Sequence, residues 1–474
     1  MEKAHNEDKS FLGTEPIRPL MFRLSVPAIL AQLINVLYNI VDRIYIGHMP
    51  EVGGLALTGL GVCTPLIIIV SAFAMLVAMG GAPNASIEMG KKNDEGAEHI
   101  MGSCVALQLV ISAVLTAALL IWNRPLLLMF GASENTIGYA SQYMNIYAIG
   151  TVFVQLTLGM NAFITAQGYA KVSMYTVLIG AICNIILDPI MIFGMNMGVR
   201  GAALATIISQ GISCVWVIHF LTSPKSSIKL RMKNIRFDNV LLSCVALGAA
   251  PFIMQASESI ISICFNSSLL KYGGDIAVGA MTILSTVMQF AMLPMQGFAQ
   301  GAQPISSYNF GAHNSARVKQ TFRLLLICCC TYSVLLWVAV QIFPQVFASL
   351  FTNDTAMVAY TKSALRIYAG AMFIMGVQIA CQMTFISLGN AKTSIFVAVF
   401  RKFIMRAGPH AYRKQQDARY MRRPKRRRRS RAAMKKPRVW RGRRVLSILR
   451  ISGIRYARTA LQAWRIVKNC DSAM

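Results

Sequence analysis

Ionisable side chains occur inside long apolar stretches of this sequence, where their burial is costly and usually serves a function. They are Asp42, Asp188, Glu258 and the pair Arg401 and Lys402. Asp188 is the most isolated, because residues 172–199 contain no other charged residue. A carboxyl group withdrawn from water there would exchange a proton near neutral pH, and with amide and hydroxyl oxygens around it the same site would suit Na⁺.

The first apolar helix presents a polar face. Asn35, Asn39 and Asp42 fall at i, i+4 and i+7, so they share one side of a helix. Tyr38 lies next to them. A polar face on a membrane span points into protein or water, because lipid cannot satisfy it. Pro27 removes a backbone donor a few turns earlier, which predicts a kink in this helix.

The fifth apolar stretch carries a similar pair, since Asn184 lies one turn before Asp188 and Pro189 follows directly. Both aspartates also have a purely structural interpretation. Asp42 would then be a helix-end residue paired with the adjacent Arg43 at the outer surface. Asp188 would have a structural role within the bundle.

Other side chains repeat at helical spacing and are candidates for a substrate cavity. The fourth stretch has Thr157, Asn161 and Thr165; the second half has the polar stripe Gln255, Ser259, Ser262 and Asn266, flanked by Glu258, and the methionines Met281, Met288, Met292 and Met295. Such stripes also occur as hydrogen-bonding or core features, but flexible thioethers suit a cavity that accepts many apolar shapes. The predicted cavity comprises Asn35, Tyr38, Asn39, Asn161, Gln255, Glu258, Met288 and Met292.

Motifs for enzyme chemistry are missing from the sequence. It contains no P-loop of the form G-x-x-x-x-G-K-[ST], and its 11 cysteines form no C-x-x-C pair or cluster with zinc spacing. A membrane-embedded enzyme would need a nucleophile with a base, yet His219, the one histidine well inside an apolar run, has no obvious partner. We therefore expect no enzyme and no cofactor, and transport driven by an ion gradient of H⁺ or Na⁺.

The elements that must position these residues are long apolar segments. Of 474 residues, 55% are hydrophobic and only 14% are charged, with a mean hydropathy of +0.51. Soluble domains carry about 25% charged residues, so a soluble enzyme is excluded. Segments that fit a span of about 20 residues are predicted at 20–46, 56–80, 99–122, 138–165, 172–195, 200–222, 239–268, 276–304, 322–343 and 363–388, with another start at 393.

An internal repeat at a constant offset of 221 divides these segments into two sets. Gly80, Pro83, Ser86, Gly90 and Asn93 are matched by Gly301, Pro304, Ser307, Gly311 and Asn314. Each set starts with the same orientation, because six spans are an even number, so the copies are parallel repeats. The predicted fold is an all-α polytopic membrane protein of two parallel six-helix bundles, the second incomplete. Two such bundles would meet along a central cleft, which can open to one side of the membrane and then to the other. This architecture favours a transporter.

The chain is accordingly divided into an N-terminus (1–18), a first bundle (19–222), a basic linker (223–237), a second bundle of about four and a half helices (238–405) and an Arg-rich tail (406–474). The linker has five Lys or Arg and no acid, which predicts a cytoplasmic position. Six preceding spans place the N-terminus on the same side. We expect a multi-pass monomer in the cell inner (plasma) membrane, with the lipid bilayer as a partner.

The run Tyr38–Asp42, the motif Asn184-x-x-x-Asp188-Pro189 and the G-x-x-P elements at Gly80 and Gly301 resemble the multidrug and toxic compound extrusion (MATE) family, in particular its MepA-like branch. The resemblance covers roughly residues 15–405. It implies an antiporter of two six-helix bundles that exports cationic and amphipathic drugs against H⁺ or Na⁺. It also implies a cation-coupling cluster of Asp42, Asn184 and Asp188, a helix bend at Pro27 and a functional acid at Glu258.

The composition changes abruptly after about Met405. Residues 406–474 hold 23 of the 47 Lys and Arg and offer no hydrophobic twelfth helix. One interpretation is a polybasic tail that binds anionic lipid or RNA. The other is a slip of the reading frame, which leaves the tail without function and the chain without a nucleic-acid partner.

Two alternatives to drug export follow. A frame slip would remove most of the last two spans and leave a non-functional, truncated transporter. A flippase for lipid-linked precursors, which belongs to the same superfamily as the family that the motifs resemble, would need cationic residues in its cavity to hold pyrophosphate. Spans 1 to 10 supply few of these, with Arg366 the main candidate.

The frame-slip hypothesis predicts that another reading frame of the coding DNA around codon 405 encodes two apolar helices. Resequencing this region tests it. Restoration of two such helices would identify the tail as an artefact or a lesion, whereas other frames without apolar segments would leave the polybasic tail as the native end of the second bundle.

Overall fold

The structure is a computed structural model that describes residues 11–50, 52–349 and 355–396. At 258–279, 282, 355–357, 367 and 371 it describes only the backbone. The side chain of Glu258, the pair Arg401 and Lys402, and the whole Arg-rich tail therefore lie outside the described residues.

The first half of the chain forms the six predicted spans. They are α3 (Ile17–Gly47), α4 (Gly53–Gly90), α5 (Asp94–Ile121), the pair α7 (Ile137–Ile149) and α8 (Thr151–Ala166), α9 (Ala170–Pro189) with the π-helix η1 (Ile190–Gly194), and α10 (Val199–Thr222). The short helices α2 (Phe11–Thr14) and α6 (Asn123–Met129) precede α3 and α7. Helices α7 and α8 meet at Gly150 with a bend of 57°.

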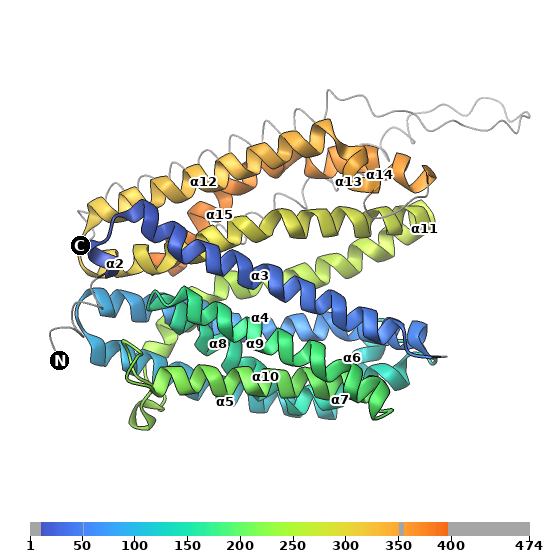
Figure 1. Ribbon diagram of the computed structural model, residues 1–474, viewed down its shortest axis with the longest axis horizontal. Coiled ribbons are helices and arrows are strands. Elements are labelled where there is room, and N and C mark those ends of the chain that lie inside the picture. Colours follow the sequence, from blue (N-terminus) through green and yellow to red (C-terminus); the bar gives the residue numbers. More distant parts are fainter. Residues whose placement is uncertain (1–10, 51, 350–354, 397–474) are drawn as a thin grey trace, which may run out of the picture.

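The second half departs from the predicted spans at two places. Its elements are η2 (Met232–Asn234), α11 (Val240–Gly311), α12 (Ser315–Ile342), α13 (Pro344–Ser349), α14 (Thr355–Tyr368), η3 (Ala369–Ala371) and α15 (Met372–Ser387). The spans predicted at 239–268 and 276–304 are joined in α11, whose 72 residues would measure about 110 Å if straight. Figure 1 shows α11 turning back at its right-hand end instead. The span predicted at 363–388 is interrupted by η3.

Seven helices in the described ranges, or eight if α7 and α8 count as one span, are long and apolar enough to cross a membrane. In Figure 1 the blue-to-green helices α3 to α10 form one group, and the yellow-to-orange helices α11 to α15 lie beside it. A hydrophobic cluster that includes Leu12, Leu24, Ala170, Met295 and Leu325 joins the two groups near the N-terminal end.

The halves touch through glycines at this same end. A Cβ atom on Gly90 would overlap the Tyr308 carbonyl oxygen, and one on Gly311 would overlap the Ile87 carbonyl oxygen. Gly311 and Tyr308 lie 221 positions after Gly90 and Ile87, so the contact is reciprocal, as across a two-fold axis. Only glycine allows two backbones to approach this closely.

Local backbone features also recur at the offset of 221. Lys92 and His313 both have positive φ angles, of 61° and 55°. The side chains of Asn93 and Asn314, one residue later, each cap the following helix by accepting a backbone N–H. These equivalent turns support the predicted duplication, which stays a prediction along with the domain boundaries.

Replacing Gly311 with Ala is expected to force the two halves apart, because the new methyl group meets a backbone carbonyl that cannot rotate away. The expected loss of stability is about 1–3 kcal/mol, measurable as a lower melting temperature of the purified protein in detergent. Gly138→Ala is the matched control, since a Cβ there meets nothing within 4 Å. Equal melting temperatures for the two variants would contradict the close contact.

Candidate cation and substrate site

Helices α3 and α9 bring the three residues of the predicted cation site together. Asp42, Asn184 and Asp188 are all buried, with exposed fractions of 8%, 2% and 0%. The Asn184 Nδ2 atom donates to Asp188 Oδ1 at 3.2 Å. The carboxyl groups of Asp42 and Asp188 lie within hydrogen-bonding reach of each other. The long contact between α3 and α9 therefore places both acids in one small volume.

This cluster has more oxygen acceptors than donors. Asp42 Oδ1, Asn184 Oδ1 and Asp188 Oδ2 are buried and have no hydrogen-bond partner among the described residues. A buried acceptor without a partner is destabilising, and two adjacent carboxylates also repel each other. Two carboxylates and one amide oxygen are suitable ligands for a proton or for a hard cation such as Na⁺.

The structural alternative for Asp42 pairs this residue with Arg43. Arg43 is exposed, whereas Asp42 is buried. In the part of the chain that the structure describes, Asp42 and Arg43 form no ion pair within 4.0 Å, but the Arg43 charge still acts on the Asp42 carboxyl group electrostatically. Consecutive residues on a helix point in different directions, so the guanidinium group does not follow the carboxyl group inward.

The backbone at Asp188 is irregular. Pro189 follows it without an N–H group, and the helix continues as η1, a π-helix. Single π-turns inside α-helices often occur at functional sites. The motif of Asn184, Asp188 and Pro189 did not predict the π-helix. A local sequence pattern does not specify which backbone hydrogen bonds form after the proline.

Aromatic side chains surround the acid pair. Tyr38, Tyr143 and Tyr147 are close enough to interact electrostatically with Asp42 or with one another, and Thr206 lies near Tyr143. The rings of Tyr143 and Tyr147 stack with their centroids 6.3 Å apart. Sequence reasoning missed Tyr143 and Thr206, which come from α7 and α10. Tyr147 had a signal, since Tyr368 matches it in the repeat.

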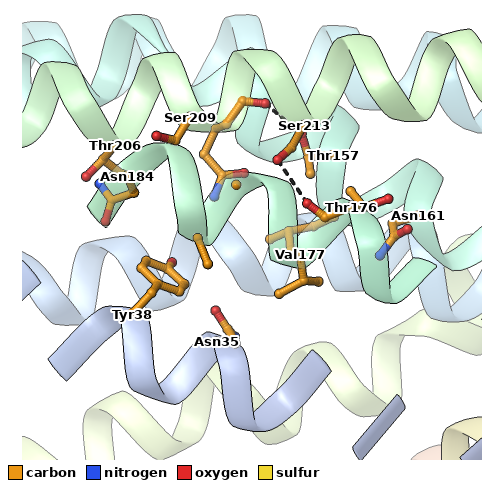
Figure 2. Close-up of a pocket in the computed structure, with 14 residues that line it drawn as sticks. Asn35, Tyr38, Thr157, Asn161, Thr176, Val177, Asn184, Thr206, Ser209 and Ser213 are labelled. Carbon is orange, nitrogen blue, oxygen red and sulfur yellow. Dashed lines mark hydrogen bonds between the residues drawn. The ribbon is translucent and has the colours of Figure 1, made fainter. Parts of the chain in front are cut away.

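A cavity of about 100 Å³ lies beside the acid pair, between α3, α8, α9 and α10. Figure 2 shows Tyr38 and Asn35 on α3 on one side and Asn184, Thr176 and Val177 on the other. Its polar lining consists of neutral side chains: Asn35, Tyr38, Thr157, Asn161, Thr176, Asn184, Thr206, Ser209, Gln210 and Ser213. Drug-sized ligands occupy pockets of about 300–1,000 Å³. In this conformation the cavity therefore suits waters or a hydrated ion.

Some polar groups of the lining form hydrogen bonds with the backbone of neighbouring helices. Thr157 Oγ1 donates to the Gln210 carbonyl oxygen at 3.1 Å, and Ser213 Oγ donates to the Thr176 carbonyl oxygen at 3.1 Å. Asn161 Nδ2 donates to the Ser173 carbonyl oxygen at 3.3 Å. In contrast, the side-chain oxygens of Asn161 and Gln210 are buried and have no donor among the described residues. These two oxygens remain available to water or to a ligand.

The other predicted cavity residues whose side chains the structure describes do not line this cavity. Asn39 is exposed and donates to the backbone carbonyl oxygen of Asn35, one turn back on α3. Met288 and Met292 on α11 pack against separate hydrophobic clusters of the second half. Gln255 is partly buried on the first part of α11. Their predicted contact with substrate stays a prediction, as does the bend at Pro27, which lies inside α3.

Known proteins resemble this chain in sequence. The family model described as MatE matches residues 27–190 and 251–407. The multidrug export protein MepA of Staphylococcus haemolyticus (strain JCSC1435) is 24% identical over 373 residues, covering 78% of this chain and 82% of that protein. MepA of Staphylococcus aureus (strain N315) is 23% identical over 401 residues, covering 84% and 88%.

Solved structures show the same arrangement of helices. A crystal structure of a MATE protein in the bent conformation has a TM-score of 0.85 at 20% identity and covers 98% of this chain and 99% of its own. The structure of the MATE multidrug transporter DinF-BH has a TM-score of 0.76 at 32% identity, covering 82% and 86%. The first of these likenesses concerns the fold alone.

Replacing Asp42 with Asn is expected to stabilise the purified protein at alkaline pH, because it removes the repulsion between two neighbouring carboxylates. Melting temperatures of the wild type should fall as the pH rises, because the folded state still holds a proton between the two acids after the unfolded state has lost its own. The variant should show a flatter profile. Parallel pH profiles for both proteins would show that the acids do not share a proton.

Proposed function

Because this chain belongs to the MatE family of transporters, we propose that it is a secondary multidrug antiporter, which exports cationic and amphipathic compounds in exchange for H⁺ or Na⁺. The chain is an all-α membrane transporter of the MATE type and not an enzyme. Its relatives export multiple drugs, according to their names, and the proposal extends this activity to the present chain. The coupling ion and the substrate class are the proposed part.

The buried oxygen cluster of Asp42, Asn184 and Asp188 is the observation that carries the proposal. Two carboxyl groups in contact, with acceptors that lack donors, favour a bound cation over an empty site. No cationic side chain lines the adjacent cavity in the described part of the chain. An external proton or Na⁺ ion is therefore the natural partner, and its binding would neutralise the pair.

Alternating access would couple this ion to the drug. The cation stabilises the conformation in which Asp42 and Asp188 are in contact, and the drug stabilises one in which the cavity is wider. Each ligand shifts the equilibrium only by the difference in its affinity for the two conformations. The small cavity volume supports this assignment, because a drug would require α3 to move away from α9 and α10.

The orientation follows from charge. The linker between α10 and α11 carries Lys225, Lys229, Arg231, Lys233 and Arg236, so we propose that it faces the cytoplasm, together with the N-terminus. The transporter would act in the plasma membrane as a monomer, without a nucleic-acid partner. Drugs would leave toward the end of α3 at which Asp42 lies.

The flippase alternative finds less support. Recognition of a pyrophosphate needs cationic groups in the cavity, yet Arg366 is exposed near the end of α14. The lining of the described cavity is polar and uncharged. A non-functional, truncated transporter remains the second alternative. Efflux by the chain as it stands would exclude it.

Replacing Asp188 with Asn should abolish ethidium efflux and drug resistance in cells, because the amide cannot exchange a proton or balance Na⁺. Efflux is measured with the chain as it stands and with a version in which two apolar helices follow residue 405. Glu134→Gln, which neutralises an exposed acid, is the matched control and should leave efflux intact. Undiminished efflux by the Asp188 variant would remove the coupling role.

A further inference from the structure

A short N-terminal segment crosses the junction between the two halves. Helix α2 lies at the left-hand end of Figure 1, next to the start of α3. The ring of Phe11 covers Gly168 of the first half, and Gly13 lies against the ring of Tyr308 of the second half. Leu12 is fully buried in the cluster that joins both halves. The segment thus touches both sides of the interface that Gly90 and Gly311 close.

Arg317 on α12 holds this segment by its backbone. Its Nη2 atom donates to the carbonyl oxygens of Leu12 at 3.1 Å and Glu15 at 2.7 Å. Its Nε atom donates to Asn309 Oδ1 at 3.0 Å, and Asn309 Nδ2 donates to the same Leu12 carbonyl at 2.9 Å. One guanidinium group and one amide therefore satisfy the carbonyls at the end of α2, where a positive charge is favourable.

A second set of contacts fixes the turn between α2 and α3. Arg23 forms an ion pair with Glu15 at 3.0 Å and lies over the ring of Phe11 at 5.2 Å. These contacts are local to the first half, whereas those of Arg317 come from the second half. The segment is consequently built into the first half and clamped by the second.

We propose that residues 11–16 form a latch, which Arg317 and Asn309 close and which holds the two halves together at the N-terminal end. This inference rests on the proposed rocking of the halves. Separation of Gly90 from Gly311 at this end must also pull Arg317 away from the Leu12 and Glu15 carbonyls. The latch then sets the population of the conformation that is open at this end, and its loss raises that population.

The test measures the distance between the halves directly. Spin labels are placed at Glu95→Cys and Ala316→Cys in the full chain with its native cysteines replaced; both sites are exposed, lie in the first turns of α5 and α12 and differ by the offset of 221. Double electron–electron resonance gives the distribution of distances. Arg317→Gln is expected to increase the longer-distance population several-fold relative to the parent.

Arg323→Gln is the matched control, because it removes an exposed arginine from the same helix. It should leave the distribution unchanged. Arg317→Lys keeps the charge but not the planar group whose Nη2 atom reaches two carbonyls while its Nε atom reaches Asn309, so its distribution should lie between the parent and the Gln variant. The melting temperature of each variant shows that it is folded.

An unchanged distribution for a folded Arg317→Gln variant would overturn the latch, as would an equal shift for Arg323→Gln. Because the measurement needs neither a drug nor an ion gradient, it separates the latch from the proposed antiport. Loss of efflux with Asp188→Asn and a shifted distance with Arg317→Gln are independent results.

Discussion

Two carboxyl groups in contact inside an apolar bundle are the interaction on which this structure depends. Asp42 and Asp188 come from different helices, and the Arg43 charge acts on Asp42 from outside the buried pair. Their desolvation and mutual repulsion oppose the packing of α3 against α9 unless a proton or a cation is bound. Occupancy and conformation are therefore linked, and the same property that makes the pair unfavourable for folding makes it suitable for energy coupling.

Helix α3 connects this pair to the junction between the halves. Leu20, Met21 and Leu24 at its beginning are buried in the cluster shared by both halves, and Asp42 lies near its other end. Pro27 stands between these regions and leaves one helix hydrogen bond unmade. A movement of α3 at the acid pair would thus reach the reciprocal glycine contact and the α2 segment through one continuous element.

The parts of the candidate site that lie within one helix could be predicted from the sequence. Asn184 lies one turn before Asp188, so its hydrogen bond to the carboxyl group follows from helical spacing. Asn39 shows the limit of this reasoning, since it shares the helix face of Asp42 but turns back to the carbonyl of Asn35. Tyr143 and Thr206 could not be assigned, because the approach of Tyr143 to Asp42 and the place of Thr206 in the cavity lining depend on how α7 and α10 pack against α3.

The sequence by itself determined the apolar spans of the first half, the all-α membrane class and the isolated acids, because hydropathy and burial cost act residue by residue. The tertiary structure decided which acids meet, how α11 turns back without a break in its helix, and where α2 lies. These features depend on contacts between distant segments, such as Gly311 with Ile87 and Arg317 with Leu12. The periodicity of residues within one helix does not specify which residues of another helix they will contact.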